Sequence, residues 1–422
     1  MTRRLLIAVL ALLMVAAPAS GALAQWTDAP FCGDLAPEDC DLLVANVAAM
    51  RELASATYTL EMTSTATAEE ETFSFVFNSE GALAYNKADM DALKEEVLDT
   101  TVREALALMR DPEALGDRVL GYVERVLLAP SADMSFEVVL PEAAMGGMAG
   151  ATLTARVIMV DGVVYFTSPL IDTLMAAGED AVEETWFSLD LMRLKDMAVE
   201  WLEGPAFAAR MDAIRDAMRA GRLPMPAMRD FPKMQRMMAR MAAFMSAPYW
   251  ETFRSDEFLA TFVSVARLDD AMVDDVPVAV FEMTLDFGAL AETETFQEFM
   301  ADYMRLFAFA GGAPSGAPEM ETMLPAMMAM LKGTTMTYTQ AIGLEDALTY
   351  VVDMRYTAEV DPAAMSEAMG ETPGNIEVAS VTQAVTMSLT LGDHNAPLAI
   401  AAPADAVSLI DLFRGMMRPR TD

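Results

Sequence analysis

The stretches TTMTYTQAI (334–342) and ALTYVVDMRYTAEV (347–360) carry the pattern that decides the fold. In the first, Met336, Tyr338 and Ile342 alternate with threonines. In the second, the same alternation aligns five larger side chains: Leu348, Tyr350, Val352, Met354 and Tyr356. Successive side chains of a strand point to opposite faces of a sheet. Each stretch therefore predicts a strand with one apolar face and one threonine-rich polar face.

The same alternation recurs along the chain and predicts eleven or twelve strands. The other segments are 56–66, 72–78, 134–140, 152–160, 163–169, 186–191, 258–268, 276–287 and 380–391. Asp161-Gly162 between two of them is a strong signal for a two-residue hairpin, and Asp274-Asp275 is a second turn. Hairpin connections favour antiparallel pairing. A sheet of such strands exposes one face to water and must cover the other.

Helical patterns separate the groups of strands. They cover residues 41–54, 87–130, 192–250, 291–332 and about 404–417. We therefore predict an α+β fold. Its centre is a large, strongly curved antiparallel sheet, an open half-barrel, with helices covering the concave face and additional helical insertions.

The N-terminus predicts export. Residues 1–24 combine Arg3 and Arg4, an apolar run and a small-residue cleavage site at Ala24, as in a signal peptide. Residues 25–40 follow as an N-terminal loop, in which we expect Cys32 and Cys40 to form a local disulfide. We expect residues 41–422 to form a single domain with a helical insert at 192–250.

Composition excludes several classes of function. The 422 residues carry a formal net charge of −36, which disfavours binding to nucleic acids. A single histidine, His394, leaves little scope for histidine-based metal chemistry. No GxSxG, SxxK, HExxH, GxGxxG or GxxxxGK[ST] motif occurs. We expect no catalytic residue, no metal and no cofactor, and an Asp393-His394 pair in a turn-like LGDHNAP stretch leaves a hydrolase only as a remote alternative.

The 38 methionines bear on which side chains cover the apolar face of the sheet. Many of them follow helical spacing, which is consistent with ordinary packing of helices on the sheet. Methionine also adapts to varied apolar partners, which suits a deformable lid over a lipid pocket. Copper binding through thioethers is the third interpretation, but these methionines lie among Ala, Leu and Phe rather than in polar segments.

Two sets of residues are candidates for binding. The apolar pocket candidates are Phe73, Phe75, Phe77, Val157, Met159, Phe281, Met283, Leu285, Met336, Tyr338, Tyr350, Val352, Met354, Met387 and Leu389. The insert is basic in an acidic chain, which suits anionic lipid headgroups or pairing with the acidic remainder of the protein. Its candidates for headgroup contact are Arg215, Arg219, Arg222, Arg229, Lys233, Arg236 and Arg240.

Three stretches carry a resemblance to a known family. They are MVDGVVYFTSPL (159–170) with WFSLDL (186–191), DDVPVAVFEMTLDFGAL (274–290), and VTMSLTLGDHNAPLAIAAPADA (385–406). Together they resemble the extracytoplasmic lipid-carrier superfamily that includes LolA, LolB and the LprG/LppX lipoproteins. The resemblance implies an open half-barrel that binds acyl chains.

We accordingly expect an exported, periplasmic or secreted protein that is not an enzyme. It would bind or carry acyl lipids or similar apolar ligands in a pocket of the concave sheet, with possible transient contact with a membrane surface. The alternative is a structural or interaction protein of the bacterial envelope whose sheet is fully plugged and holds no ligand.

Overall fold

The structure is a computed structural model of the whole chain. It describes residues 30–68, 71–88, 91–92, 120–122, 124–139, 150–169, 185–205, 209, 244, 247–310, 328–329, 331–360 and 381–417. The predicted signal peptide and the seven basic residues of the insert lie outside the described residues, so these predictions stay open. Among the described helices, none is long and apolar enough to cross a membrane.

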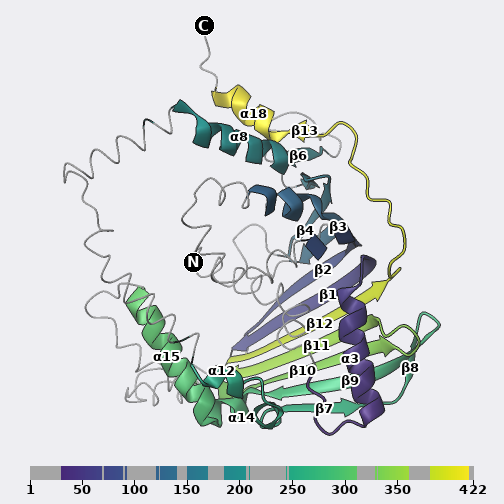
Figure 1. Cartoon of the computed structure of the whole chain (residues 1–422), viewed down its shortest axis with the longest axis vertical. Helices are drawn as coiled ribbons and strands as arrows, with labels where there is room; N and C mark the ends of the chain where they lie inside the picture. Colours follow the sequence, from purple (N-terminus) through teal and green to yellow (C-terminus); the bar gives the residue numbers. More distant parts are fainter. Residues whose placement is uncertain are drawn as a thin grey trace. The chain divides into compact units, whose positions relative to one another are not determined.

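Strands dominate the described part of the chain (Figure 1). They are β1 (Ser55–Ala68), β2 (Glu71–Tyr85), β3 (Pro130–Val139), β4 (Thr152–Val160), β5 (Val163–Thr167), β6 (Phe187–Asp190), β7 (Val263–Arg267), β8 (Ala271–Val273), β9 (Val276–Asp286), β10 (Thr334–Gly343), β11 (Thr349–Val360), β12 (Val381–Gly392) and β13 (Val407–Ser408). The helices are α3 (Pro37–Arg51), α8 (Leu191–Glu203), α12 (Tyr249–Thr252), α13 (Asp256–Leu259), α14 (Phe287–Glu292), α15 (Glu294–Ala310) and α18 (Leu409–Met417).

All thirteen strands of the described residues belong to one sheet. Its order is β13-β6-β5-β4-β3-β2-β1-β12-β11-β10-β9-β7, with β8 pairing with β9 beside β7. The pairs from β2 to β6 and from β7 to β11 are antiparallel, whereas the two-residue β13 pairs in parallel with β6. The order ends at β13 and β7 without closing. The predicted α+β class and open antiparallel sheet are therefore confirmed.

The hairpin turns follow the sequence signals. Asp161 and Gly162 both have positive φ, 53° and 74°, as a two-residue turn of the primed type requires. Asp274 and Asp275 form the β8–β9 turn with φ values of 46° and 66°, a conformation that aspartate tolerates better than most residues. Gly162 is also tightly packed, since a Cβ there would lie 2.9 Å from the Met192 Cγ of α8.

One predicted strand is partly wrong. Residues 258–268 were expected to be extended throughout, but their first part belongs to α13 and only Val263–Arg267 is strand. The cause is local: the Ser255 hydroxyl accepts a hydrogen bond from the Phe258 amide and caps a helical turn. The apolar side chain of Phe258 is buried by that turn rather than by a strand.

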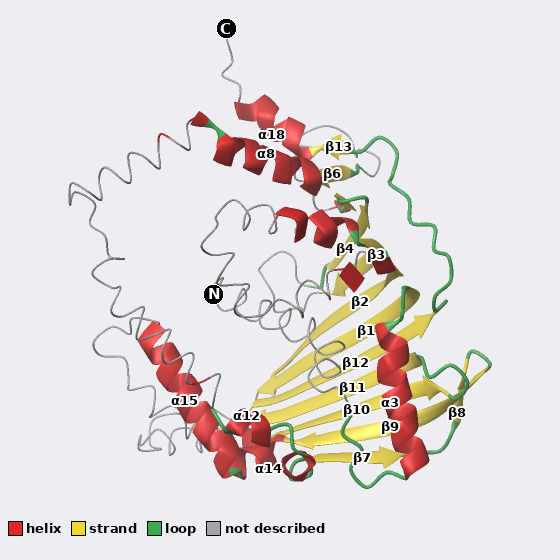
Figure 2. Cartoon of the chain, viewed as in Figure 1, coloured by secondary structure: helices red, strands yellow, loops and turns green. Residues whose placement is uncertain are grey.

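The chain divides into two compact units, which we describe separately. Unit 1 comprises residues 1–52, 64–72 and 236–388, and so contains α3, α12–α15 and β7–β11. Unit 2 comprises residues 53–63, 73–235 and 389–422, and contains β3–β6, β13, α8 and α18. Figure 2 shows the strands of unit 1 as neighbouring arrows, with α3 crossing them.

Candidate binding face

The strand register of unit 1 arranges its large side chains in three rows on one face of the sheet. The middle row is Val265, Met283, Tyr338 and Met354, on β7, β9, β10 and β11. The outer row is Val263, Leu285, Met336 and Tyr356, and the inner row is Arg267, Phe281, Gln340 and Val352. Directly opposed residues of neighbouring strands contact one another. The structure thus brings together seven of the predicted pocket residues: Phe281, Met283, Leu285, Met336, Tyr338, Val352 and Met354.

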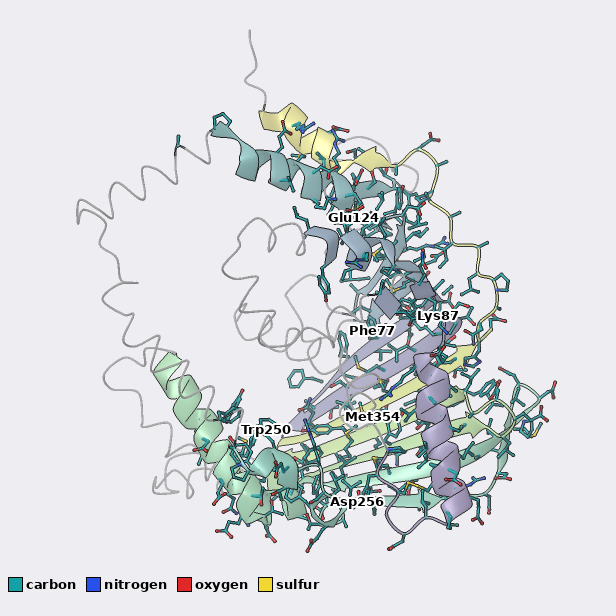
Figure 3. All side chains as sticks on the ribbon, viewed as in Figure 1. Phe77, Lys87, Glu124, Trp250, Asp256 and Met354 are labelled. Carbon is teal, nitrogen blue, oxygen red and sulfur yellow. A yellow bond between two sulfur atoms is a disulfide. The ribbon has the colours of Figure 1, made fainter. Side chains whose placement is uncertain are left out.

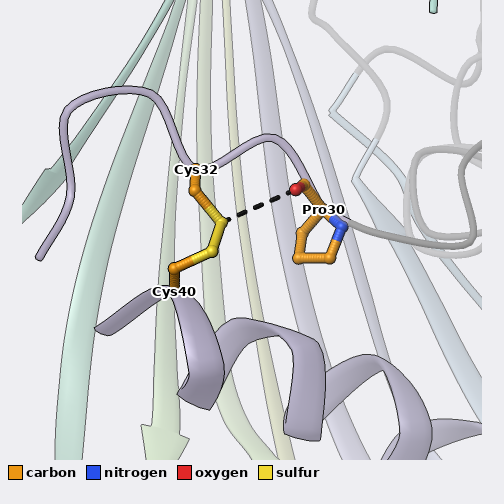
Figure 4. The surroundings of a disulfide bond; sticks show 3 residues. All are labelled: Pro30, Cys32 and Cys40. Carbon is orange, nitrogen blue, oxygen red and sulfur yellow. Dashed lines mark hydrogen bonds between the residues drawn. A yellow bond between two sulfur atoms is a disulfide. The ribbon is translucent and has the colours of Figure 1, made fainter. Parts of the chain in front are cut away.

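Helix α3 covers the inner end of this face. Its Leu43 packs with Ala279, Phe281 and Ile342 in a buried cluster. The helix is tied at its start by the disulfide between Cys32 and Cys40, whose Cα atoms lie 5.4 Å apart. Figure 4 shows this disulfide, with the Cys32 Sγ 3.6 Å from the Pro30 carbonyl oxygen. The predicted disulfide is confirmed, and it closes the loop that leads into α3.

A buried polar network attaches α3 to the sheet. Asn46 donates from Nδ2 to the Ala347 carbonyl at 2.7 Å and to the Thr349 hydroxyl at 3.0 Å. Gln340 donates from Nε2 to the Asn46 Oδ1 at 2.9 Å and to the Thr349 hydroxyl at 2.7 Å. Asn46, Gln340 and Thr349 are not among the residues that the sequence pattern predicts for the site. The available signal was Gln340 itself, a polar residue at the apolar phase of its strand.

The middle row lies next to this core and is less covered. Met354 is buried, but Val265, Met283 and Tyr338 are only half-buried. Figure 3 labels Met354 on its strand. Burial raises the pKa of Tyr338 to about 12. Within the described residues no hydrogen bond reaches its hydroxyl, which makes Tyr338 the unusual polar group of an otherwise apolar row.

The only charged residue of the three rows is Arg267, and it is fully engaged. Its guanidinium bonds to the carboxylates of Asp39 and Asp270 and to the carbonyls of Leu268 and Val280. It also lies over the Phe281 ring, 5.1 Å from the centroid. The face therefore presents no uncommitted charge among its described residues.

For one predicted pocket residue, Tyr350, the alternation of the sequence predicts the wrong face of the sheet. A register shift between Ala341 and Ile342 pairs Ile342 with Thr349 and Ala341 with Val351, so Tyr350 is the extra residue of a β-bulge. Thr349 consequently turns toward α3. Tyr350 lies on the opposite face, against Gly343, and donates to the Asp346 Oδ2 at 2.7 Å. Its assignment to the apolar face is corrected accordingly.

Behind the middle and outer rows, the opposite face of unit 1 is polar, as predicted. Thr337 pairs there with Thr284 and is followed across the sheet by Ser264. The hydroxyls of Thr335 and Thr357 are hydrogen-bonded at 2.8 Å. The middle and outer rows are therefore apolar on one face only, whereas at the inner end Val278 and Ala341 are buried on the opposite face.

Unit 2 has an apolar face of its own, which contains five other predicted residues. Val157 pairs with Phe166 and Met159 with Val164. Phe77 lies 6.0 Å from Phe136, ring centre to ring centre. Phe75 is half-buried and Phe73 is 39% exposed. In unit 2 the hydroxyls of Tyr58 and Ser79 are hydrogen-bonded to each other at 2.9 Å, whereas the Tyr338 hydroxyl has no such bond among the described residues.

The remaining candidates are placed as follows. On β12, Met387 is buried in unit 1 and Leu389 is half-buried in unit 2. His394 lies in the turn after β12, between Asp393, which accepts a hydrogen bond from Thr57, and Asn395, which accepts one from the Ala54 amide. That turn anchors the end of the strand, which gives its polar residues a structural role.

Comparison of the sequence with known proteins finds no match. No protein-family model matches the chain, and no curated protein matches it. Among solved structures, the chain is similar to the lipoprotein LppX of Mycobacterium tuberculosis, with 8% identity and a TM-score of 0.21, over 86% of this chain and 97% of that one.

A second solved structure is a DUF1329 family protein from Desulfovibrio piger. It matches with 7% identity and a TM-score of 0.16, over 84% of this chain and 92% of that one.

Proposed function

We propose that this protein is an exported, non-catalytic binder or carrier of acyl lipids or similar apolar ligands. The ligand's acyl chain lies against the middle and outer rows of unit 1. The observation that carries the proposal is the middle row, in which Val265, Met283 and Tyr338 lie next to a buried core but are only half-buried, opposite polar residues. Export is supported by the disulfide and by the signal-like N-terminus.

The affinity of such binding depends on how much of the acyl chain is buried. Each sequestered CH₂ group contributes roughly 0.8 kcal/mol. Association and ordering cost on the order of 4–15 kcal/mol, so a short chain would bind weakly and a long acyl chain is required. Met283, Met336 and Met354 suit this task, because unbranched thioether side chains repack around chains of different shape.

The chemistry of the rows supports binding rather than turnover. They hold aliphatic and thioether groups, one phenyl ring, two phenols, one amide and a guanidinium that is already bonded. Among the described residues, no cluster of three or more His, Cys, Asp or Glu side chains is arranged to hold a metal ion. We therefore assign the face no reaction.

Arginine substitution on either face of one strand tests the proposal. Met283→Arg places a charge in the middle row, and Thr284→Arg places the same charge on the adjacent residue of the polar face. Native mass spectrometry of exported protein, before and after organic extraction, measures bound lipid. We expect an extractable acyl-lipid mass on the wild type and on Thr284→Arg, and its loss from Met283→Arg.

Folding must be separated from binding. Circular dichroism checks each variant, and Met283→Gln offers a milder change of similar length should Met283→Arg fail to fold. A folded Met283→Arg or Met283→Gln variant with the full lipid complement would contradict the proposal. A wild-type protein without bound lipid, which also refuses added lipid, would favour a plugged sheet and the envelope interaction protein.

A further inference from the structure

We propose that the acidic tip of unit 1, defined as residues 268–277 and 344–346, docks on a basic protein surface whose centre is apolar. The acidic tip comprises β8, the residues on either side of it and the turn that follows β10. This inference goes beyond lipid binding and does not depend on it, because the acidic tip uses none of the residues of the three rows. It follows from the composition of the acidic tip, its exposed apolar residues and its charge.

Composition separates the acidic tip from the rest of the chain. Its thirteen residues are all either apolar or acidic, and none is basic. Six of the thirteen are Asp or Glu, a far larger share than the 64 acidic residues among all 422. The general acidity of the chain therefore does not account for the acidic tip.

Three exposed apolar residues lie next to one another at the acidic tip. Met272 on β8 is opposite Pro277 on β9, and the Leu344 amide donates to the Pro277 carbonyl at 3.1 Å. Met272 is 64% exposed and Leu344 is 43% exposed, and Pro277 is exposed as well. Met272 is the most exposed of the large apolar side chains in the described part of the chain. Apolar residues that gather on the surface inside a polar rim are typical of a site of protein contact.

The acidic tip is held in place by the core beneath it. Ala271 pairs with Val278, which is fully buried, and Val278 is opposite Gly343 on β10. Figure 1 shows β8 at the end of these strands. A surface that is already ordered loses little conformational entropy when a partner docks on it.

The charge of the acidic tip selects the partner. Two of its six carboxylates are engaged, since Asp270 bonds to Arg267 and Asp346 accepts a hydrogen bond from Tyr350. The other four form no ion pair with the described residues; they are Asp269, Asp274, Asp275 and Glu345. Carboxylates around an apolar centre are complementary to lysine and arginine side chains around an apolar centre.

The same charge argues against other occupants. Two copies of the chain would repel each other tip to tip, and the anionic headgroups of a membrane would repel the acidic tip as well. Among the described residues, no group of three or more His, Cys, Asp or Glu side chains is arranged to hold a metal ion. A basic protein surface is the occupant that matches both the apolar and the charged part.

Three synthetic amphipathic helical peptides of equal length serve as probes. Each carries leucine on one face, and lysine, glutamine or glutamate on the other. Fluorescence anisotropy measures their binding to the exported protein, and hydrogen-exchange mass spectrometry locates it. We expect the lysine peptide to bind most tightly, to protect the acidic tip from exchange and to lose affinity as salt is added.

Serine substitutions test the apolar contact. Met272→Ser should weaken binding of the lysine peptide about fivefold or more, the loss typical of a central contact residue. Val44→Ser is the matched control, because Val44 is an apolar residue of α3 that is exposed to a similar extent as Leu344. We expect the control to bind the lysine peptide as the wild type does.

Amide substitutions test the charge. Asp274→Asn combined with Asp275→Asn should weaken binding about two- to tenfold and reduce its dependence on salt. Asparagine adopts the left-handed conformation of this turn readily, so the hairpin is retained. Asp353→Asn combined with Glu359→Gln removes two exposed carboxylates from β11 and should leave the affinity unchanged.

The outcomes separate this inference from lipid binding. The inference is wrong if Met272→Ser binds the lysine peptide as tightly as Val44→Ser does, or if the protection falls on the three rows or is spread over the chain. Self-association that Met272→Ser abolishes, or binding of anionic vesicles through the acidic tip, would also overturn it and identify that occupant instead. The lipid mass bound by the wild type is measured separately, so either proposal fails without the other.

Discussion

Replacing Asn46 with alanine should weaken the attachment of α3 to the sheet far more than an ordinary substitution on a helix would. The side chain is 5% exposed and makes three hydrogen bonds, to Ala347, Thr349 and Gln340. Alanine removes all three and leaves buried polar partners behind. At about 0.5–1.5 kcal/mol for each bond, the free energy that holds α3 on the sheet should fall by about 2–4 kcal/mol.

Hydrogen-exchange mass spectrometry measures this locally, which avoids assuming that the whole chain unfolds in one step. A loss of about 2–4 kcal/mol corresponds to roughly 30- to 1000-fold faster exchange in peptides that cover α3. Val44→Ala is the control, because Val44 lies on the same helix and is 43% exposed. Exchange after Asn46→Ala that stays within a few-fold of the control would refute the reasoning.

A double-mutant cycle then tests whether the network acts as a unit. Thr349→Val removes the hydroxyl that accepts from both Asn46 and Gln340. Since the two substitutions delete overlapping bonds, their combined effect should be smaller than the sum of the single effects. Strict additivity would mean that the two side chains are held independently.

Two further predictions concern pH and packing. Tyr338 has a folded pKa of about 12, above the usual value of about 10, so its contribution to stability is complete below pH about 10 and is lost as the pH rises to about 12. Tyrosinate absorbance should show late-titrating phenols, of which Tyr338→Phe removes one, and an unchanged titration would contradict the desolvation. Gly162→Ala should cost about 1–2 kcal/mol in a urea titration, because Gly162 has a φ of 74° and its Cβ would crowd Met192. A midpoint equal to that of the wild type would show that the hairpin relaxes without cost.

The alternation of apolar and polar residues was sufficient to locate most strands and their faces. It assigned Met283, Tyr338 and Met354 to one face, and the register confirms that they form a row. The hairpin at Asp161-Gly162 and the Cys32–Cys40 disulfide could also be predicted from the sequence, because each depends on residues close together in the sequence.

The wrong face predicted for Tyr350 shows the limit of prediction from alternation. Alternation assumes an unbroken period of two, whereas a bulge inserts one residue and exchanges the faces of its neighbours. Whether a bulge forms depends on the partner strand and on what lies above it. Here Thr349 gains the Asn46 and Gln340 network and Tyr350 gains Asp346.

By itself, the sequence determined the class of fold, the amphipathic character of the strands and the acidity of the chain, since these follow from local periodicity and composition. Tertiary structure alone decided which side chains become neighbours. Asn46 and Gln340 are separated by 294 residues, and no local pattern links them. Met283 and Met354 likewise become neighbours of Tyr338 only because the strands pair in this register, which depends on packing in three dimensions.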